Sequence, residues 1–261
     1  MTAATPSPKN GRPLAGIAVV VTRPRKQASA VVAQLRDAGA RVVELPVIDI
    51  EGPGDGGTAL RTALTTIDIY DWLVFTSANT VDRVLGSAPE VNLLRDVRIA
   101  AVGRSTATEL ERRNVQPQLV PPRYVAEALL EAFPSGPGRV LLPCAAQARD
   151  VLAEGLRTKG WVVDVVEAYR TVAQAVDAET LNAALAADVV TFTASSTVKA
   201  FVNLAAGRRV PPVVVCIGPV TAATATKHGL QVDAVATDHT AEGLVLAVVG
   251  EVRRRRTNSR T

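Results

Sequence analysis

The sequence contains one block twice: Phe75-Thr76-Ser77-Ala78-Asn79-Thr80-Val81 recurs as Phe192-Thr193-Ala194-Ser195-Ser196-Thr197-Val198. Three other blocks recur in the same order, roughly 115 to 121 positions apart, and pair residues 17–39 with 140–160, 101–107 with 216–222, and 126–129 with 241–244. A repeat at a nearly constant offset predicts a duplicated half. We therefore expect two similar lobes with a ligand site between them.

Short apolar stretches alternate with amphipathic ones along both halves. Val19-Val20-Val21 is a β-branched run, residues 27–38 carry apolar side chains at helical spacing, and Gly39 follows where a helix would end. Nearly all-apolar strands separated by helices indicate a parallel sheet that is covered on both faces. The predicted fold class is α/β, with doubly wound parallel sheets.

Two stretches depart from this alternation, residues 46–51 and 167–172, and they occupy equivalent places in the two halves. Each alternates polar with apolar side chains, which suits a two-stranded ribbon exposed on one side. We interpret them as crossovers between the lobes. The residues alone leave open whether the lobes are sequential or interleaved.

Composition narrows the class of protein. The chain has 261 residues, 48% hydrophobic and 21% charged, and its apolar runs are far shorter than the roughly 18 to 20 residues of a membrane span. Residues 1–13 lack the apolar core of a signal peptide, so we expect a flexible leader on a cytoplasmic protein. Cys216, in an apolar run, is expected to be a buried strand residue.

The formal net charge of +4 belongs to one end of the chain. Residues 251–261 hold five Arg and one Glu, so the other residues sum to zero. We expect this segment to be a solvated, disordered basic tail. An aromatic content of 3% leaves little for base stacking, which argues against a single-strand nucleic-acid binder.

Six loops that are rich in Ser, Thr, Gly or Pro follow predicted strands, and most lead into a helix. Free N–H groups and the dipole at a helix start bind anions, although the same residue types also serve simply as helix caps. Repetition in both halves favours a shared role in holding a polyanionic ligand. The candidate ligand-binding residues in these loops are Arg23, Thr76, Ser77, Asn79, Gly103, Ser105, Thr106, Cys144, Thr193, Ser195, Ser196, Thr197, Gly218, Pro219 and Thr221.

Several signatures are missing from the sequence. The first strand is followed by Thr22-Arg23-Pro24 rather than a Gly-x-Gly-x-x-Gly turn, and neither a P-loop nor a Gly-x-Ser-x-Gly elbow occurs. The two histidines form no cluster at metal-ligand spacing. His228 is expected at a surface helix end, whereas His239 lies in a loop from which it could reach the ligand. We expect chemistry without a metal, a nucleotide or a catalytic triad.

With these residues in view, the chain resembles the uroporphyrinogen-III synthases of tetrapyrrole synthesis. The likeness covers residues 16–249 and is carried by an ordered set of motifs rather than by a single one. These are Val20-Val21-Thr22-Arg23-Pro24, Leu45-Pro46, the two blocks quoted first, Ala101-Val102-Gly103, Ala168-Tyr169-Arg170-Thr171 and Cys216-Ile217-Gly218-Pro219-Val220-Thr221-Ala222.

The resemblance implies two interleaved lobes that are joined by a two-stranded β-ladder. Residues 1–46 and 173–250 would form domain 1 and residues 52–166 domain 2, with 47–51 and 167–172 as the ladder and 251–261 as the basic tail. It also implies the reaction, in which hydroxymethylbilane loses water and closes with its last ring inverted to uroporphyrinogen III, without a cofactor or metal. The matching tyrosine, Tyr169, would be the acid that assists departure of the hydroxyl.

The sequence departs from the family pattern at Pro143-Cys144, where many bacterial members have a basic residue. This departure assigns more of the anion binding to Arg149 or Arg23. We expect a monomer whose partners are the bilane and its product, with neither a membrane nor nucleic acid among them. The alternatives are a non-catalytic, two-lobed anion-binding or regulatory module of the same fold and an α/β enzyme acting on a nucleotide.

Overall fold

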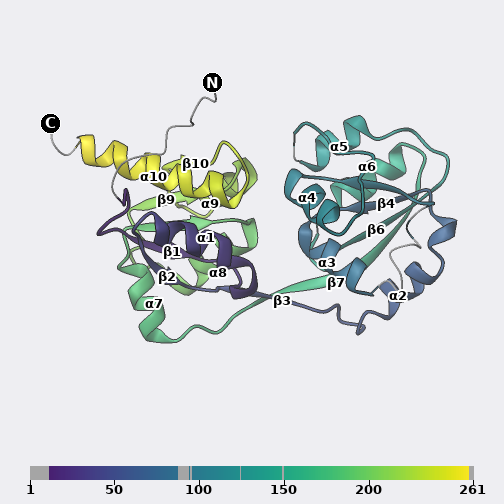
Figure 1. Cartoon of the computed structure of the whole chain (residues 1–261). Helices are drawn as coiled ribbons and strands as arrows, with labels where there is room; N and C mark the ends of the chain where they lie inside the picture. The colour runs from purple at the N-terminus through teal and green to yellow at the C-terminus, as the bar shows by residue number, and fades with distance from the viewer. Residues whose placement is uncertain (1–11, 88–93, 95, 124, 149, 259–261) are drawn as a thin grey trace, which may run out of the picture. The chain divides into compact units, whose positions relative to one another are not determined.

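A computed structural model describes residues 12–87, 94, 96–123, 125–148 and 150–258 of the chain (Figure 1). It divides into two compact units. Unit 1 combines the chain up to Asp49 with the chain from Ala173 onward, and unit 2 is Ile50–Val172. Unit 1 is therefore discontinuous in sequence, and unit 2 is inserted into it.

Unit 1 is built on a five-stranded sheet of order β10-β9-β8-β1-β2, whose pairs are all parallel. Counted along the chain and read from β2, this is the order 2-1-3-4-5. The elements of unit 1 are β1 (Ala18–Val21), α1 (Arg25–Asp37), β2 (Arg41–Glu44), α7 (Ala178–Leu185), β8 (Val189–Phe192), α8 (Ser195–Ala205), β9 (Val213–Cys216), α9 (Pro219–Lys227), β10 (Ala234–Val235) and α10 (Ala241–Asn258).

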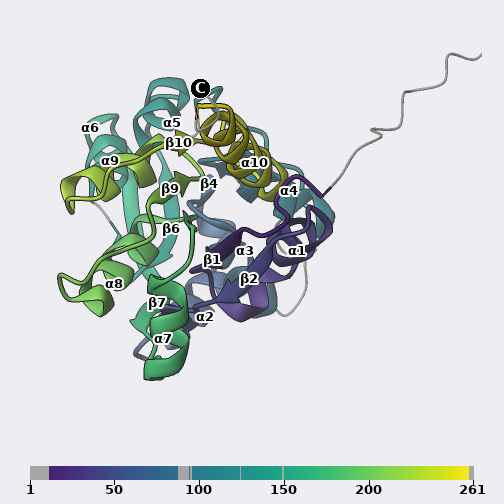
Figure 2. The same cartoon turned by 90° about the vertical axis from the view of Figure 1, so that its left-hand side faces the viewer.

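Helices cover both faces of this sheet because successive strand residues point to opposite sides. Val19 and Val21 pack with α1 and α10 in one apolar cluster, while Ala18 and Val20 pack with α7, α8 and α9 in another. The pairs α1 with α10 and α8 with α9 lie side by side (Figures 1 and 2). The strands are buried on both faces, as their uninterrupted apolar runs predict.

Unit 2 repeats this plan in a sheet of order β3-β7-β6-β4-β5. A single parallel bridge between Ala100 and Leu119 occupies the position that β10 has in unit 1. The elements around this sheet are β3 (Ile48–Glu51), α2 (Thr58–Thr65), the 3-10 helix η1 (Ile67–Ile69), β4 (Trp72–Phe75), α3 (Ala78–Ser87), β5 (Arg98–Ala101), α4 (Arg104–Arg112), α5 (Ala126–Ala132), β6 (Arg139–Ala145), α6 (Val151–Thr158) and β7 (Val162–Ala173).

The two faces of this second sheet are also covered. Leu73 and Phe75 pack with α2, α3 and α4, whereas Trp72 and Val74 pack with α5 and α6. The predicted fold class is therefore confirmed: the chain is an α/β protein with two doubly wound parallel sheets. The chain crosses from one unit to the other within β3 and at the end of β7, which are neighbouring strands.

The duplication extends to side chains that hold the starts of the strands. Asp71 Oδ2 accepts a hydrogen bond from the Arg139 N–H at 2.8 Å, and Asp188 Oδ2 accepts one from the Ala18 N–H at 2.7 Å. Each aspartate directly precedes a central strand and pairs it to the neighbouring strand across the point where the order reverses. The two units thus share specific contacts as well as topology.

Residues 251–258 were expected to belong to a disordered tail, and this expectation is wrong. They form the last turns of α10, in which Glu251 is 5% exposed and accepts hydrogen bonds from Arg254 and Arg255. Arg256 donates to the carbonyls of Pro13 and Ala15 at 2.9 and 2.8 Å. Most of the basic segment is therefore a folded part of unit 1.

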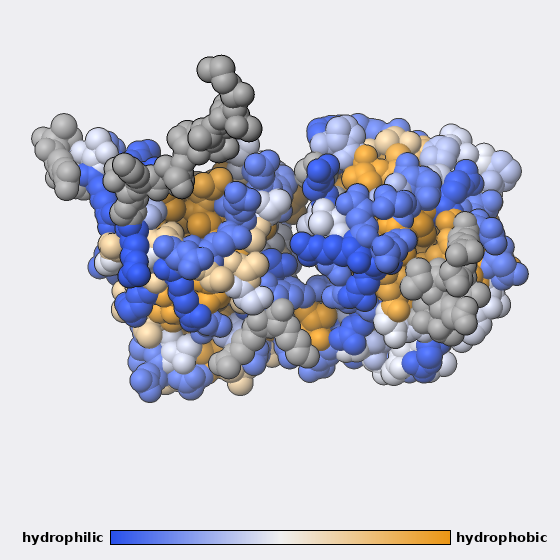
Figure 3. All heavy atoms as spheres, in the orientation of Figure 1, coloured by the Kyte–Doolittle hydropathy of each residue, from blue (hydrophilic) through white to orange (hydrophobic). Residues whose placement is uncertain are grey.

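Hydrophilic residues are interspersed with hydrophobic ones on the face of each unit that Figure 3 shows. Within the described ranges, every helix is too short or too polar to cross a membrane.

Candidate active site

The carboxyl ends of the strands in unit 1 form an edge with a reversal point between β1 and β8. From β1 the chain continues outward to β2, while β8 leads outward to β9 in the opposite direction. Thr22 Oγ1 donates to the Thr191 carbonyl and Thr191 Oγ1 donates to the Val20 carbonyl, both at 2.8 Å. Open parallel sheets bind ligands at such a point.

We define rim 1 as the residues that follow β1, β8 and β9 at this edge: Thr22, Arg23, Pro24, Thr193, Ala194, Ser195, Ser196, Ile217, Gly218 and Pro219. The side chains of Thr193, Ser195 and Ser196 are half-buried, and Pro219 is exposed. Helices α8 and α9 begin at Ser195 and Pro219, so both helix starts lie here; Pro219 has no N–H, and α9 therefore offers the N–H groups of the residues that follow it. Rim 1 therefore offers hydroxyl and backbone donors with the positive end of two helix dipoles.

Arg23 supplies a cation to rim 1. Its guanidinium is half-buried, and its Nε donates to Gln27 Oε1 at 3.3 Å. Desolvation by burial lowers its pKa below the ordinary value, but an arginine stays charged at neutral pH. A partly desolvated cation interacts more strongly with an anion than a fully solvated one does.

His239 lies against rim 1, although it is distant in sequence from the other members. Its imidazole is half-buried, and a Cβ added at Gly218 would meet the ring carbons and Nε2 at 3.3 to 3.4 Å. Gly218 thus leaves room for the ring. His228, in contrast, ends α9 at an exposed position, as expected.

Rim 2 is the equivalent edge of unit 2. We define it as the residues that follow β4 and β5, namely Thr76, Ser77, Ala78, Asn79, Gly103, Arg104 and Ser105, together with Tyr169. Thr76, Ser77, Asn79 and Gly103 are half-buried, while Arg104 and Ser105 are exposed. Helices α3 and α4 begin at Ala78 and Arg104, so rim 2 also carries two helix starts.

Tyr169 belongs to rim 2 through its hydroxyl group. It is 8% exposed in β7, and its Oη lies 3.2 Å from Ser77 Oγ. Its carbonyl accepts a hydrogen bond from the Ala146 N–H at 2.9 Å. The strand that leaves unit 2 therefore places a phenol beside the hydroxyl-rich start of α3.

Three of the candidate threonines are buried. Thr106, Thr197 and Thr221 are 3, 1 and 6% exposed, and the Thr197 hydroxyl donates to the Ala194 carbonyl at 2.8 Å. Each lies in the first turn of a helix, where its side chain packs towards the sheet. These side chains serve the fold, and a ligand at the rims would meet their neighbours instead.

Cys144 was expected in a loop, and this expectation is wrong. Strand β6 runs through Pro143 and Cys144 to Ala145, and Cys144 pairs with Glu167 of β7. The thiol is buried, and desolvation, with smaller contributions from Asp150 and Glu167, raises its pKa. It is therefore a poor nucleophile and a poor donor. Arg149, the other candidate near this strand, lies outside the described residues.

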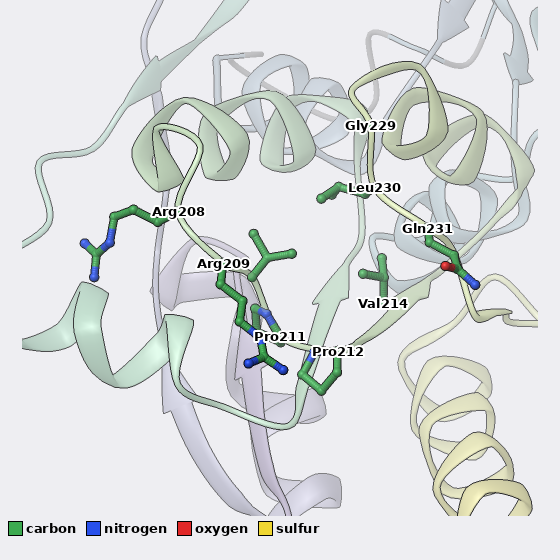
Figure 4. A pocket seen from close by; sticks show the side chains of 9 residues that line it. Arg208, Arg209, Pro211, Pro212, Val214, Gly229, Leu230 and Gln231 are labelled. Carbon is green, nitrogen blue, oxygen red and sulfur yellow. The ribbon is translucent and has the colours of Figure 1, made fainter.

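A hollow at the opposite edge of unit 1 is unrelated to rim 1. It lies where the chain enters β9 and β10 and is lined by Arg209, Pro211, Pro212 and Leu230 (Figure 4). The side chain of Arg208 extends away from it and donates to Asn182 Oδ1 at 2.7 Å. Over the described residues, no group of three or more His, Cys, Asp and Glu side chains could hold a metal ion.

One member of this arrangement was missed by the sequence reasoning. Thr80 is fully buried, its Oγ1 lies 3.0 Å from Ser77 Oγ, and it connects through Ser77 to Tyr169. The signal was present, because Thr80 and Thr197 occupy the same position of the repeat.

Fold and rims together define a class of protein: two-unit α/β proteins with duplicated parallel sheets whose carboxyl edges are rich in hydroxyl groups. Within this class the chain belongs to the uroporphyrinogen-III synthase family, since the family model described as Uroporphyrinogen-III synthase HemD matches residues 29–246. The resemblance inferred from the motifs is thus confirmed.

Named relatives agree with this assignment. The chain is 34% identical to the uroporphyrinogen-III synthase of Synechococcus elongatus, over 91% of this chain and 96% of that protein. It is 30% identical to the chloroplastic uroporphyrinogen-III synthase of rice, Oryza sativa subsp. japonica, over 82% of this chain and 73% of that protein.

Solved structures share the fold. A mutant uroporphyrinogen III synthase of the extremely thermophilic bacterium Thermus thermophilus superposes with a TM-score of 0.67 at 20% identity, over 92% of this chain and all of that chain. The synthetase of Helicobacter pylori 26695 gives a TM-score of 0.60 at 17% identity, over 90% and 98% of the two chains.

Proposed function

We propose that this chain is a synthase that converts hydroxymethylbilane into uroporphyrinogen III, a step of tetrapyrrole and haem biosynthesis. The observation that carries the proposal is the family match over residues 29–246, supported by relatives of the same printed name that align along nearly the whole chain. The enzyme class is a lyase, because the reaction removes water from its substrate.

The chemistry of the substrate determines what the protein must supply. The pyrrole nitrogen of the first ring expels the terminal hydroxyl, which leaves as water once protonated, and an azafulvene electrophile remains. The substituted carbon of the last ring then attacks this electrophile and gives a spiro intermediate, which reopens and closes again with that ring inverted. Without guidance the free carbon attacks and the uninverted isomer forms, so selectivity depends on orientation.

The rims suit this task. The substrate carries eight carboxylates, which the proposal assigns to neutral hydroxyl and N–H donors at each rim, with Arg23 as an added cation in rim 1. The assigned donors are Arg23, Thr193, Ser195, Ser196 and Gly218 in rim 1 and Thr76, Asn79, Gly103 and Ser105 in rim 2. Pro219 lacks an N–H and can only pack against the substrate, and the Ser77 hydroxyl lies beside Tyr169. Correct positioning of reacting groups can supply about 7 to 11 kcal/mol of a barrier.

Tyr169 is assigned the role of acid. Its phenol lies at rim 2 beside Ser77, and in the proposal it gives its proton to the departing hydroxyl. A phenol is a weak acid, and the substrate already expels its hydroxyl unaided. The contribution of Tyr169 is therefore modest compared with that of orientation.

The decisive experiment adds the purified chain to freshly generated hydroxymethylbilane and separates the isomers of the product after oxidation. The proposal predicts that the III isomer appears faster than spontaneous closure produces the I isomer. If only the I isomer forms, at the spontaneous rate, the chain is instead a binding module of the same fold.

Tyr169→Phe should slow formation of the III isomer several-fold without abolishing it. Tyr70→Phe is the matched control, because Tyr70 is also buried but donates to Asp164 Oδ2 at 2.8 Å, away from rim 2. Equal rates for both variants would remove Tyr169 from the mechanism.

A further inference from the structure

Three hydroxyl groups form a chain at the start of α3. Thr80 Oγ1 lies 3.0 Å from Ser77 Oγ, and Ser77 Oγ lies 3.2 Å from Tyr169 Oη. The Thr80 N–H also donates to Ser77 Oγ at 3.2 Å, which is the arrangement of a helix N-cap. Ser77 therefore contacts two groups of one helical residue and the phenol of a distant strand.

The number of hydrogens on the Ser77 hydroxyl restricts which of the three hydroxyl groups can donate and which can accept. The Ser77 hydroxyl has one hydrogen and two lone pairs, and the Thr80 N–H occupies one lone pair. Of the remaining two partners, one must donate to Ser77 and the other must accept from it. Either Thr80 donates and Tyr169 accepts, or Tyr169 donates and Thr80 accepts.

Burial decides between the two directions. Thr80 is 0% exposed, and within the described part of the chain its hydroxyl has no partner other than Ser77. If Thr80 accepted from Ser77, its own hydrogen would be buried without an acceptor, which is costly. Tyr169 is 8% exposed at the rim, so its hydrogen can meet solvent or substrate. The favoured order is Thr80 to Ser77 to Tyr169.

We propose that Thr80 and Ser77 are positioning residues that hold the phenolic oxygen of Tyr169 as an acceptor, so that its proton is directed outward to the departing hydroxyl. This inference rests on the proposed function. Catalytic contact with the substrate belongs to Tyr169 alone, and Thr80 acts through two successive hydrogen bonds.

The second copy of the repeat shows the same threonine without this role. Ala194 stands where Ser77 stands in the first copy, and the Thr197 hydroxyl donates to the Ala194 carbonyl at 2.8 Å. A buried threonine at this position is thus satisfied by the backbone when the serine is absent. Because serine stands at position 77 instead of alanine, the Thr80 hydroxyl contacts a side chain that in turn contacts the Tyr169 phenol.

The test is Thr80→Val, made in the parent chain and in the Tyr169→Phe variant. In the parent chain we expect kcat for the III isomer to fall roughly 2- to 10-fold, the effect of one hydrogen bond, with KM unchanged. This fall should not exceed that of Tyr169→Phe. In the Tyr169→Phe background Thr80→Val should have no further effect, and Thr80→Ser should restore kcat in the parent background.

Two further variants separate positioning from folding. Thr197→Val removes the matching buried hydroxyl, and its change in Tm gives the structural cost of such a substitution. Ser77→Ala reproduces the Ala194 arrangement of the second copy, which the fold accommodates, and should match Thr80→Val in both backgrounds.

An equal fall in kcat with and without the phenol would overturn the proposal, and so would a rise in KM at constant kcat. If the parent chain makes no III isomer, the proposed function fails instead, and the two failures are therefore distinguishable.

Discussion

Glu251→Gln should measurably destabilise unit 1, although it alters a segment that reads as a basic tail. Glu251 accepts from Arg254 at 2.8 and 2.7 Å and from Arg255 at 2.7 Å. Arg255 also pairs with Asp233, whose Oδ2 accepts the Val214 N–H at 2.8 Å. Through Arg255 and Asp233, the carboxylate therefore connects the end of α10 to strand β9.

The magnitude follows from unequal burial. The Glu251 side chain is 4% exposed, whereas those of Arg254 and Arg255 are 58 and 40% exposed and stay solvated when the carboxylate is lost. Loss of a fully buried partner costs about 3 to 5 kcal/mol, and loss of charged hydrogen bonds about 1.5 to 3. Because solvent screens the arginines, we expect a loss of about 1 to 3 kcal/mol, or roughly 3 to 10 °C in Tm.

The matched control is Glu44→Gln, which breaks the exposed pair with Arg36 in the same unit. An exposed pair contributes about 0 to 1 kcal/mol. Unfolding should be followed by far-UV circular dichroism, since both tryptophans, Trp72 and Trp161, lie in unit 2 and do not report on unit 1.

The effect should also depend on pH. Hydrogen bonds from Arg254 and then Arg255 lower the pKa of Glu251 in the folded state. Its stabilisation is therefore complete well above the ordinary carboxyl pKa of about 4.3 and is lost as pH falls through the lower folded value. The gap between parent and Glu251→Gln should be full at neutral pH and close in acid. A Glu251→Gln loss no larger than that of Glu44→Gln would refute the reasoning.

Two other predictions concern packing and thiol reactivity. Gly243→Ala should destabilise unit 1 by about 1 to 3 kcal/mol, because the new Cβ would overlap the Asp238 carbonyl. In Gly250→Ala, a variant of the same helix, the new Cβ meets no atom, so this substitution should stabilise unit 1 by about 0.5 to 1 kcal/mol. Urea unfolding measures both changes. Burial raises the pKa of Cys216 to about 12 and also raises that of Cys144. Neither thiol should react with a disulfide reagent at pH 8 until denaturant is added, and rapid labelling of the native chain would contradict the assigned burial.

The helices and strands of the two copies of the repeat were predicted well, because the spacing of apolar residues in each segment matches the element that the segment forms. Val19 to Val21 became a doubly buried strand, and the helix expected over 27–38 runs from Arg25 to Asp37. Strand β6 was underestimated, since Pro143 lacks an N–H and reads as a loop residue, yet it pairs inside a parallel strand.

The end of α10 was missed because its run of four arginines was interpreted as part of a solvated, disordered tail. The signal that could have found it was Glu251, three and four residues before Arg254 and Arg255, the spacing of ion pairs on one helix face. What the sequence could not supply was the burial of Glu251 and the pairing of Arg255 with Asp233, which lies outside the helix.

The candidate site was predicted at the level of loops and not of atoms. Loop composition placed Thr76 and Ser77 among the candidates and the family resemblance placed Tyr169 there, but the contact between Ser77 and Tyr169 joins residues 92 positions apart. Local sequence patterns also cannot distinguish an exposed hydroxyl such as that of Ser105 from a buried one such as that of Thr106. The two residues are adjacent, and the rotation of the helix by one residue determines which side chain faces the sheet.

The discontinuity of unit 1 has a consequence for biosynthesis. Strand β1 finds its partner β8 only after some 170 further residues, since Val19 pairs with Val189, and all of unit 2 is translated in between. During translation, unit 2 can complete its sheet before β8 has been synthesised. Until then the edge of β1 that pairs with β8 is exposed, and exposed strand edges are prone to aggregation and to chaperone binding. A nascent chain that ends before β8 would contain a folded unit 2 together with β1 and β2 as an unpaired two-stranded ribbon.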